Sequence, residues 1–345
     1  MHRTKVGFWT AASLAAALSS AAAETGGTFR DWTVDCSVGL TCNASTMPSG
    51  EPAIHWLQLS RGVAAEAPVK LRLSRASGED GTLRGPVTFS TDDGRRLEVP
   101  AEAFTAVDGA YETSADIVGT RLLPAWRDAR RLTIRLDEAS GTSETTVSLV
   151  GLVAALRKID DDQARVGTAT ALVDKGERPL PDRATLPTDI PDAAALPAAV
   201  RSVWENGGGD CADRGDDPVS DLGFSVPAGD AGRIYALACG MPGAYNYPSR
   251  LYLADGDQAS PLPLPGMGDA GPNASMDVWN VDYADGQFRA FFKGRGIGDC
   301  GSYSVWRFDP SSADGLRLVE QRSKGECDGE MGEGPEGWPR DWPPR

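Results

Sequence analysis

Cysteine is the residue type through which this chain most clearly carries chemistry. The 345-residue sequence contains six cysteines, which fall into three neighbouring pairs: Cys36 and Cys42, Cys211 and Cys239, and Cys300 and Cys327. Cysteines of this kind form disulfides or bind metal, and an even set downstream of an export signal favours a disulfide framework. Each pair can be closed within one part of the chain, so we expect neighbouring cysteines to pair with each other.

The export signal occupies the first 23 residues. A basic start with Arg3 and Lys5 precedes a largely apolar stretch, Val6 to Leu18, and the small residues Ala21 to Ala23. This order is typical of a cleavable signal peptide, and we expect cleavage before Glu24. The apolar run is shorter than the ~20 residues that a membrane-spanning helix needs. The sequence therefore predicts a periplasmic protein that is not inserted in the membrane after cleavage.

Other catalytic motifs are weak. His55 is the one histidine beyond the leader, so a two-histidine zinc site is excluded, and no G-x-S-x-G is present to complete a hydrolase triad. Residues 296–301 match G-x-G-x-x-G, but a dinucleotide site needs a helix after this motif, and Ser302 to Phe308 has the pattern of a strand. We expect no cofactor.

Acidic residues give the chain a formal net charge of −15. Such a charge repels phosphate backbones and anionic lipid headgroups, which argues against nucleic acid and membrane partners. None of the acidic clusters has the spacing of a calcium loop, so no metal site is predicted, although calcium at a surface cluster stays open. A carboxylate pair for glycan hydrolysis stays open as well, because 49 acidic residues offer many pairs.

A proline-rich segment divides the chain. Five prolines between Pro179 and Pro197 stand in a stretch without aromatic residues, which is typical of an extended linker. We therefore predict an N-terminal β-rich domain over residues 24–173, a linker over 174–198 and a C-terminal disulfide-bonded β-rich domain over 199–345.

Strands dominate the predicted elements. In the first half, Val69 to Arg75 and Leu132 to Leu136 alternate apolar and polar residues, whereas Gly151 to Arg165 has helical periodicity. In the second half, Asp-Gly turns separate short strand candidates. The predicted fold is mainly β (α+β). It combines an N-terminal β-sandwich or barrel-like domain, with one or two packed helices, and a C-terminal antiparallel β-meander domain with disulfides.

One glycine-rich bend is the candidate binding site. Lys293, Arg295 and Asp299 crowd this bend, and Tyr245 and Asn246 follow Cys239 closely enough for a disulfide to fix their loop. Glycines remove side-chain bulk, so charged neighbours there would be presented to a partner. The alternative is that Arg295 and Asp299 only pair with each other or bind local backbone. Exposed tryptophans of the second half are a further candidate platform, and Trp338 either docks on the fold or stays free for a partner.

The sequence also resembles a known family. The residues that carry the resemblance are 31–36 with Cys42, 148–156, 162–165, 243–246, 293–301 and Trp338-Pro339. Together they resemble the exported six-cysteine proteins catalogued as domain of unknown function 1176, and the first half is more weakly similar to the invasion-associated locus B family. The resemblance implies export and no particular activity.

The expected function is therefore a binding or interaction module of the cell envelope that acts without catalysis. Its partner would be an envelope protein or a glycan. Two alternatives stay open: a hydrolase of cell-wall glycan or peptide that uses carboxylates, and an envelope-stress or structural factor.

Overall fold

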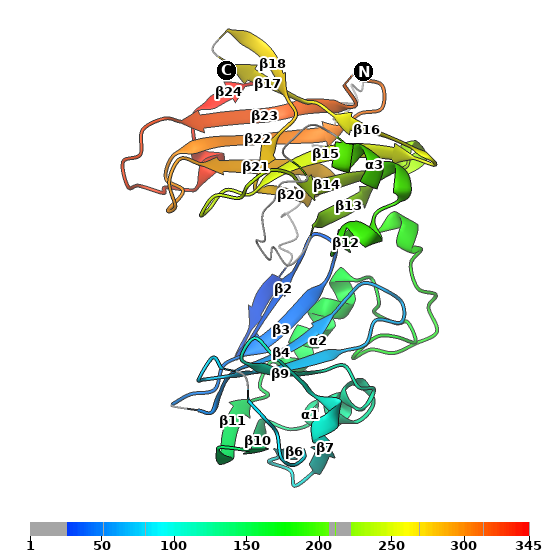
Figure 1. The fold of residues 1–345 in the computed structure, drawn as a ribbon, viewed down its shortest axis with the longest axis vertical. Helices are drawn as coiled ribbons and strands as arrows, with labels where there is room; N and C mark the ends of the chain where they lie inside the picture. The colour runs from blue at the N-terminus through cyan, green and yellow to red at the C-terminus, as the bar shows by residue number, and fades with distance from the viewer. Residues whose placement is uncertain are drawn as a thin grey trace, which may run out of the picture.

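The structure of the chain is a computed structural model, shown in Figure 1. It describes residues 26–344 except 51, 80, 207–210, 212–221, 269 and 313. The predicted signal peptide, residues 1–23, and the cleavage site before Glu24 lie outside the described residues. Strands dominate the described part, as the sequence predicts. None of the helices described is both long enough and apolar enough to cross a membrane.

The first half contains two antiparallel sheets. The seven-stranded sheet has the order β1 (Gly26–Phe29), β2 (Trp32–Cys36), β3 (Cys42–Thr46), β4 (Ile54–Arg61), β5 (Lys70–Arg75), β9 (Ala110–Thr113) and β8 (Thr105–Val107). The four-stranded sheet has the order β11 (Gly141–Ser148), β10 (Arg131–Glu138), β6 (Val87–Thr91) and β7 (Arg96–Val99). Helix α2 (Leu152–Asp162) packs on β1, β2 and β3, and the short helix α1 spans Leu123–Trp126.

The core of this half is formed by strands in which buried apolar side chains alternate with more exposed polar ones. Leu71 and Leu73 of β5 are buried, whereas Lys70 is exposed and Arg72, between the two leucines, is partly exposed. Strand β10 buries every second residue in the same way, and α2 adds an apolar stripe that includes Leu156. Both sheets and α2 contribute to one apolar cluster, because each element has one face to remove from water. This arrangement is the sandwich with packed helices that the sequence predicts.

The second half also contains layered antiparallel sheets. Its first sheet has the order β12 (Thr188–Ile190), β13 (Gly223–Pro227), β14 (Arg233–Ala238), β15 (Pro248–Asp255) and β16 (Gln258–Leu262), with β19 (Val278–Trp279) beside β15. Its second has the order β20 (Val281–Ala284), β21 (Gln287–Lys293), β22 (Gly301–Phe308), β23 (Leu316–Lys324) and β24 (Arg340–Trp342). Strands β17 (Leu264–Gly268) and β18 (Gly271–Ser275) form a hairpin, and helix α3 spans Ala198–Asn206.

Strand β14 lies in the middle of these layers and is buried on both faces. Ile234 and Ala236 join the cluster shared with the second sheet, whereas Tyr235 and Leu237 join the cluster under α3. A strand covered on both faces gives a continuous apolar run in place of alternation. The neighbouring strands follow one another along the chain, so the predicted antiparallel meander is confirmed.

The six cysteines pair as the sequence predicts. The disulfides are Cys36–Cys42, Cys211–Cys239 and Cys300–Cys327. The described residues contain no free cysteine.

The segment predicted to be a linker is only partly extended. Residues 175–185 are mostly exposed, but β12 pairs with β13, and Ile190 and Leu196 are buried with the second half. Prolines flank β12 at positions 187 and 191, where a short edge strand tolerates them. By packing, the chain from Thr188 onward therefore belongs to the second half, and the predicted domain boundaries remain a prediction.

The loop closed by the Cys36–Cys42 disulfide, which we call the clasp loop, joins the two halves. Asp189 of β12 accepts hydrogen bonds from Ser37 Oγ at 2.5 Å, from Gly39 N at 2.9 Å and from Thr41 N at 3.3 Å. Val38 packs against the apolar cluster of the second half. In Figure 1 the tip of β2 and β3 reaches β12 in this way.

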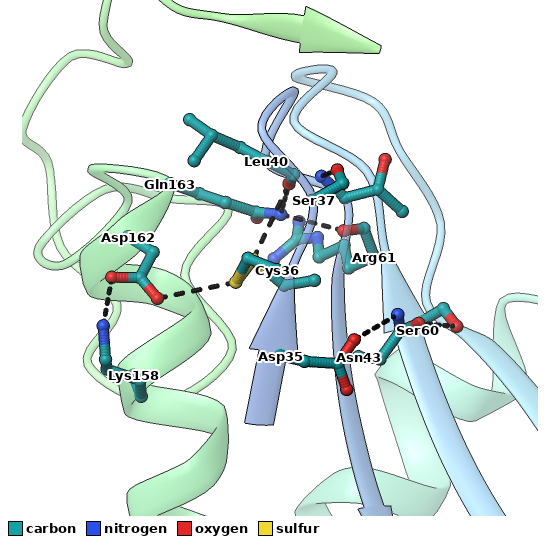
Figure 2. Close-up of a disulfide and its surroundings, with 12 residues drawn as sticks. Asp35, Cys36, Ser37, Leu40, Asn43, Ser60, Arg61, Lys158, Asp162 and Gln163 are labelled. Atoms are coloured by element: carbon teal, nitrogen blue, oxygen red, sulfur yellow. Dashed lines mark hydrogen bonds and ion pairs between the residues drawn. A yellow bond between two sulfur atoms is a disulfide. The ribbon is translucent and has the colours of Figure 1, made fainter. Parts of the chain in front are cut away.

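Residues at the C-terminal end of α2 contact the clasp loop on its other side, as Figure 2 shows. Gln163 is buried, and its side-chain amide donates to the carbonyl oxygens of Leu40 and Arg61, each at 2.8 Å. Asp162 forms an ion pair with Lys158, one helical turn earlier, and lies against Cys36. The clasp loop is therefore fixed by a disulfide, by α2 and by Asp189.

Candidate functional site

Three connections lie together at one end of the second half and contain every candidate binding residue predicted from the sequence. They are residues 239–247 between β14 and β15, 294–300 between β21 and β22, and 325–339 between β23 and β24, with Lys293 at the end of β21. We call them the loop cluster. In Figure 1 the connections after β21 and after β23 project from the same end of the sheet.

Asn246 fixes the first connection to the second. Its side-chain amide donates to Lys293 O at 2.8 Å and accepts from Lys293 N at 2.9 Å, so it completes the end of β21 as a neighbouring strand would. Asn280 donates to Asn246 Oδ1 at 3.0 Å and to Phe291 O at 2.8 Å. Asn246 is buried, and its polar atoms are used inside the protein.

Asp299 fixes the second connection to the third. Its fully buried carboxylate accepts from Arg295 Nε at 2.7 Å, from Arg295 Nη2 at 2.5 Å and from Gly329 N at 2.6 Å. The hydrogen bonds from Arg295, and then the one from Gly329, hold the pKa of Asp299 well below its ordinary value. The Cys300–Cys327 disulfide joins the same two connections covalently.

Tyr245, Lys293 and Arg295 are the candidate residues that keep exposed surface. The ring of Tyr245 covers Gly296, where a Cβ atom would lie 3.5 Å from Tyr245 Cδ1. Lys293 Nζ lies 5.8 Å from the centre of the Phe291 ring, within reach of a cation–π contact. The structure thus brings all five predicted residues together, with Asn246 and Asp299 supporting the loops. Their role in binding remains a prediction.

Exposed apolar side chains on the loop cluster were missed by the sequence reasoning. Met241 is 63% exposed, Ile297 53% and Met331 55%. Ile297 stands between Gly296 and Gly298, so neighbouring side chains cannot cover it. A large apolar residue flanked by glycines in a loop is the signal that identifies such a position.

The C-terminal tail packs on the loop cluster. Trp338 is 5% exposed, its ring meets the Phe291 ring edge-on at 5.5 Å, and its carbonyl oxygen accepts from Arg322 Nη1 at 2.7 Å. Strand β24 then pairs with β23. Of the two alternatives for Trp338, docking on the fold is the one that the structure shows.

The buried carboxylate of Asp299 predicts how the stability of the fold depends on pH. Asp299→Asn is expected to lower the free energy of unfolding at pH 7, and the deficit should shrink below about pH 3.9, the ordinary pKa of aspartate. A carboxyl whose pKa is depressed by folding stabilises the fold above its unfolded-state pKa, and this stabilisation is lost as the pH falls toward the folded-state pKa. Urea unfolding at pH 7 and pH 3 measures the difference.

The control is Glu326→Gln, which changes an exposed carboxylate beside the same disulfide. It should have almost no effect at either pH. An Asp299→Asn deficit that stayed constant between pH 7 and pH 3 would show that the hydrogen bonds of Asp299 do not depend on its charge.

The fold and the loop cluster define a disulfide-bonded, mainly β protein with a surface built from covalently joined loops. The chain belongs to the family described as protein of unknown function (DUF1176), whose family model matches residues 27–345.

The chain is similar to a curated protein and to a solved structure. The uncharacterized protein YpfG of Escherichia coli (strain K12) is 26% identical over 347 residues, which cover 91% of each protein. The crystal structure of invasion associated protein b from Bartonella henselae is similar over 40% of this chain and 98% of that chain, with 19% identity and a TM-score of 0.30.

Proposed function

We propose that this protein is an exported, periplasmic interaction module of the cell envelope, which binds another protein through the loop cluster and does not act as an enzyme. The leader-like sequence at residues 1–23 supports export. The three disulfides support an oxidising compartment, since disulfides persist in the periplasm and outside cells and are rare in the cytosol.

The observation that carries the proposal is the exposure of large apolar side chains on loops that are held rigid. Ile297 and Met331 belong to the two connections that the Cys300–Cys327 disulfide and Asp299 join. Exposed apolar surface is unfavourable in water unless a partner covers it. Rigid loops lose little conformational entropy on binding, so such side chains are suited to act as anchors in a protein interface.

The charges around these side chains indicate the chemistry of the partner. Exposed carboxylates of Glu326, Glu330 and Glu333 lie on the third connection, and the whole chain has a net charge of −15. Complementary charge favours a partner with basic side chains around an apolar surface. The partner is therefore a basic protein surface with room for a methionine or isoleucine side chain.

The environment of Asp160 supports binding over carboxylate catalysis. Burial raises the pKa of Asp160, as a general acid requires. However, this carboxylate is fully buried, and its oxygens accept the backbone N–H groups of Leu172 and Val173. A substrate has no access to it.

Site-specific photocrosslinking in cells tests the proposal. A photoreactive phenylalanine analogue at Ile297 or Met331 is expected to give a discrete adduct with one envelope protein, identified by mass spectrometry. The matched control is the same analogue at Asp257, an exposed turn residue at the far end of β15 from the loop cluster. With the purified partner, Ile297→Asp should weaken binding at least tenfold and leave thermal unfolding unchanged, because Ile297 is exposed.

Equal adducts at Ile297 and Asp257, or no adduct at all, would contradict the proposal. Sedimentation with purified cell-wall glycan separates the other class of partner. Glycan binding that Ile297→Asp abolished would show that the loop cluster binds glycan and would reject a protein partner.

A further inference from the structure

A groove of about 1070 Å³ lies on the first half, away from the loop cluster. One side is the end of strand β11, with Thr146, Val147 and Ser148. The other side is formed by the ends of β2, β3 and β4, including Thr33, Ser45 and Trp56. Nothing in the proposed function uses this groove.

The edge of β11 that borders the groove is open. Strand β11 pairs with β10 on one side, and no other described strand pairs with it. Leu149 N donates to Arg130 O at 2.9 Å, which sets the alternation of the ladder: Thr145 and Val147 bond to β10. The residues that alternate with them, Glu144 and Thr146, therefore direct their backbone N–H and C=O groups away from β10.

The protein already uses the same edge at one end. Trp32 Nε1 donates to Ser148 O at 3.1 Å, and Asp31 N donates to Val150 O at 3.2 Å. These bonds stop at Ser148. The next outward-facing backbone groups along the edge are those of Thr146, which lines the groove.

A β-bulge directs Trp56 into this region. Ile54 pairs with Arg75 and Trp56 with Ser74, so His55 is an extra residue in β4. If β4 alternated regularly through His55, without the bulge, Trp56 would lie on the core face with Ile54, which is fully buried. With it, Trp56 is 42% exposed and Leu57 returns to the core. Bulges that redirect a side chain are frequent next to binding sites.

The groove lining contains three arginines and three aspartates, and its available cations are Arg30 and Arg130, because Arg131 lies 4.0 Å from Asp92. The arginine side chains of Arg30 and Arg130 form no ion pair with a described residue. Two of the three groove carboxylates are engaged: Asp92 accepts from Arg130 N at 3.1 Å, and Asp35 accepts from an asparagine amide at 3.1 Å.

Two further features of the groove suit a ligand that has both apolar and polar groups. Met47, 67% exposed, and Val150, 42% exposed, flank it as apolar surface. Thr46 also lines it, is 4% exposed, and its Oγ1 has no hydrogen-bond partner among the described residues.

We infer that the groove binds an extended segment of another protein, which adds as a strand to the free edge of β11. The segment's backbone bonds to Thr146 and Glu144, one of its apolar side chains packs on Trp56, and one of its carboxylates reaches Arg30 and Arg130. An open strand edge recognises the backbone of any extended peptide, and the neighbouring side chains supply selectivity. A glycan would satisfy the hydroxyl groups but would not use the alternating backbone donors and acceptors.

A random ten-residue peptide library displayed on phage, selected on the purified disulfide-bonded protein, tests this inference. We expect peptides with alternating apolar residues and at least one acidic residue. For the selected synthetic peptide, Thr146→Pro should raise the dissociation constant at least tenfold, because proline removes the outward N–H. Trp56→Ala and Arg130→Ala should each raise it about threefold to tenfold, which corresponds to losing one good contact.

The matched control is Glu98→Pro on β7, the edge strand at the opposite side of the same sheet. Thr91 N donates to Arg95 O at 2.9 Å, so the N–H of Glu98 likewise faces outward. Peptide binding should survive this change. A second readout does not depend on how the variants fold: methylating the alternate peptide nitrogens that face β11 should abolish binding to the unchanged protein, whereas methylating the other set should leave binding intact.

Three outcomes would overturn the inference. They are the absence of any selected peptide, equal losses in Thr146→Pro and Glu98→Pro, and binding that tolerates methylation of both alternating sets of peptide nitrogens.

Discussion

Asp160→Ala is expected to lower the free energy of unfolding by roughly 3–5 kcal/mol, the cost of leaving buried charges without their partner. Asp160 belongs to α2 and is fully buried. Leu172 N donates to it at 2.7 Å and Val173 N at 2.9 Å, which fixes the chain that leaves the first half. Arg61 Nη1 lies 3.9 Å from its Oδ1.

Two buried arginines depend on this carboxylate. Arg165 is 1% exposed and donates to Val63 O at 2.9 Å and to Thr170 Oγ1 at 2.7 Å. Burial lowers the pKa of Arg61 to about 10; repulsion from Arg165 acts in the same direction, and attraction to Asp160 opposes both. Without Asp160, the two cations would stay buried close together without the carboxylate that attracts both of them.

Denaturant unfolding with the disulfides intact measures this effect, provided that the slope of the transition stays constant. The matched control is Asp161→Ala, the next residue of α2, which is exposed and should change the free energy of unfolding by less than about 0.5 kcal/mol. An Asp160→Ala variant as stable as the Asp161→Ala variant would show that the buried arginines do not need the carboxylate.

The contrast between these two aspartates shows what the sequence could predict. Residues 160–162 resemble one acidic cluster, and we weighed it for calcium. Helical periodicity distinguishes its members, because Asp160 lies four residues after Leu156 on the buried stripe and Asp161 does not. Burial of Asp160 could therefore be predicted from the sequence. The N–H donors that satisfy it, at Leu172 and Val173, depend on how the following loop folds back.

Strands were predicted well where burial alternates locally. Residues 69–75 and 132–136 correspond to β5 and β10, since a period of two is a property of a few neighbouring residues. Strand β12 was missed inside the proline-rich segment. Its three residues become a strand only by pairing with β13, more than thirty positions along the chain, and no local pattern encodes that pairing.

The loop cluster also shows that contacts between distant residues cannot be predicted from local sequence patterns. The bend at 293–301 was selected for its glycines and charges, and the pairing of Arg295 with Asp299 was weighed as an alternative to their exposure. The structure forms that pair. It also gives Asn246 a supporting role through bonds to Lys293, which the sequence could not show because the two residues are 47 positions apart.

Gly39→Ala is expected to disconnect the two halves of the molecule. A Cβ atom at this position would lie 1.9 Å from Asp189 N and 2.2 Å from Asp189 Oδ1, far inside contact distance. The clasp loop cannot move aside freely, because its ends are joined by the Cys36–Cys42 disulfide and Gln163 holds Leu40. The loop must therefore leave Asp189, and Val38 must leave the apolar cluster of the second half.

The loss of contact energy between the halves is large because the three hydrogen bonds that Asp189 accepts are broken at the same time. Bonds to a charged group contribute about 1.5–3 kcal/mol each, so losing even two of the three should weaken the contact between the halves by about 3 kcal/mol or more. In calorimetry, the unchanged protein is expected to unfold in one coupled transition. Gly39→Ala should give two transitions, the first about 6–12 °C lower, as the entropy of unfolding of a 150–250-residue unit implies.

Two further variants separate steric from polar effects at the clasp loop. Gly62→Ala is the matched control: its Cβ atom would have one neighbour, Ala67 Cβ at 3.8 Å, so the melting profile should not change. Asp189→Asn keeps the shape of the contact but removes the charge, and it should lower the first transition by less than Gly39→Ala does. If Gly39→Ala retained a single transition at the original temperature, the clasp loop would not couple the halves. Their connection would then rest on the chain between residues 174 and 188 alone.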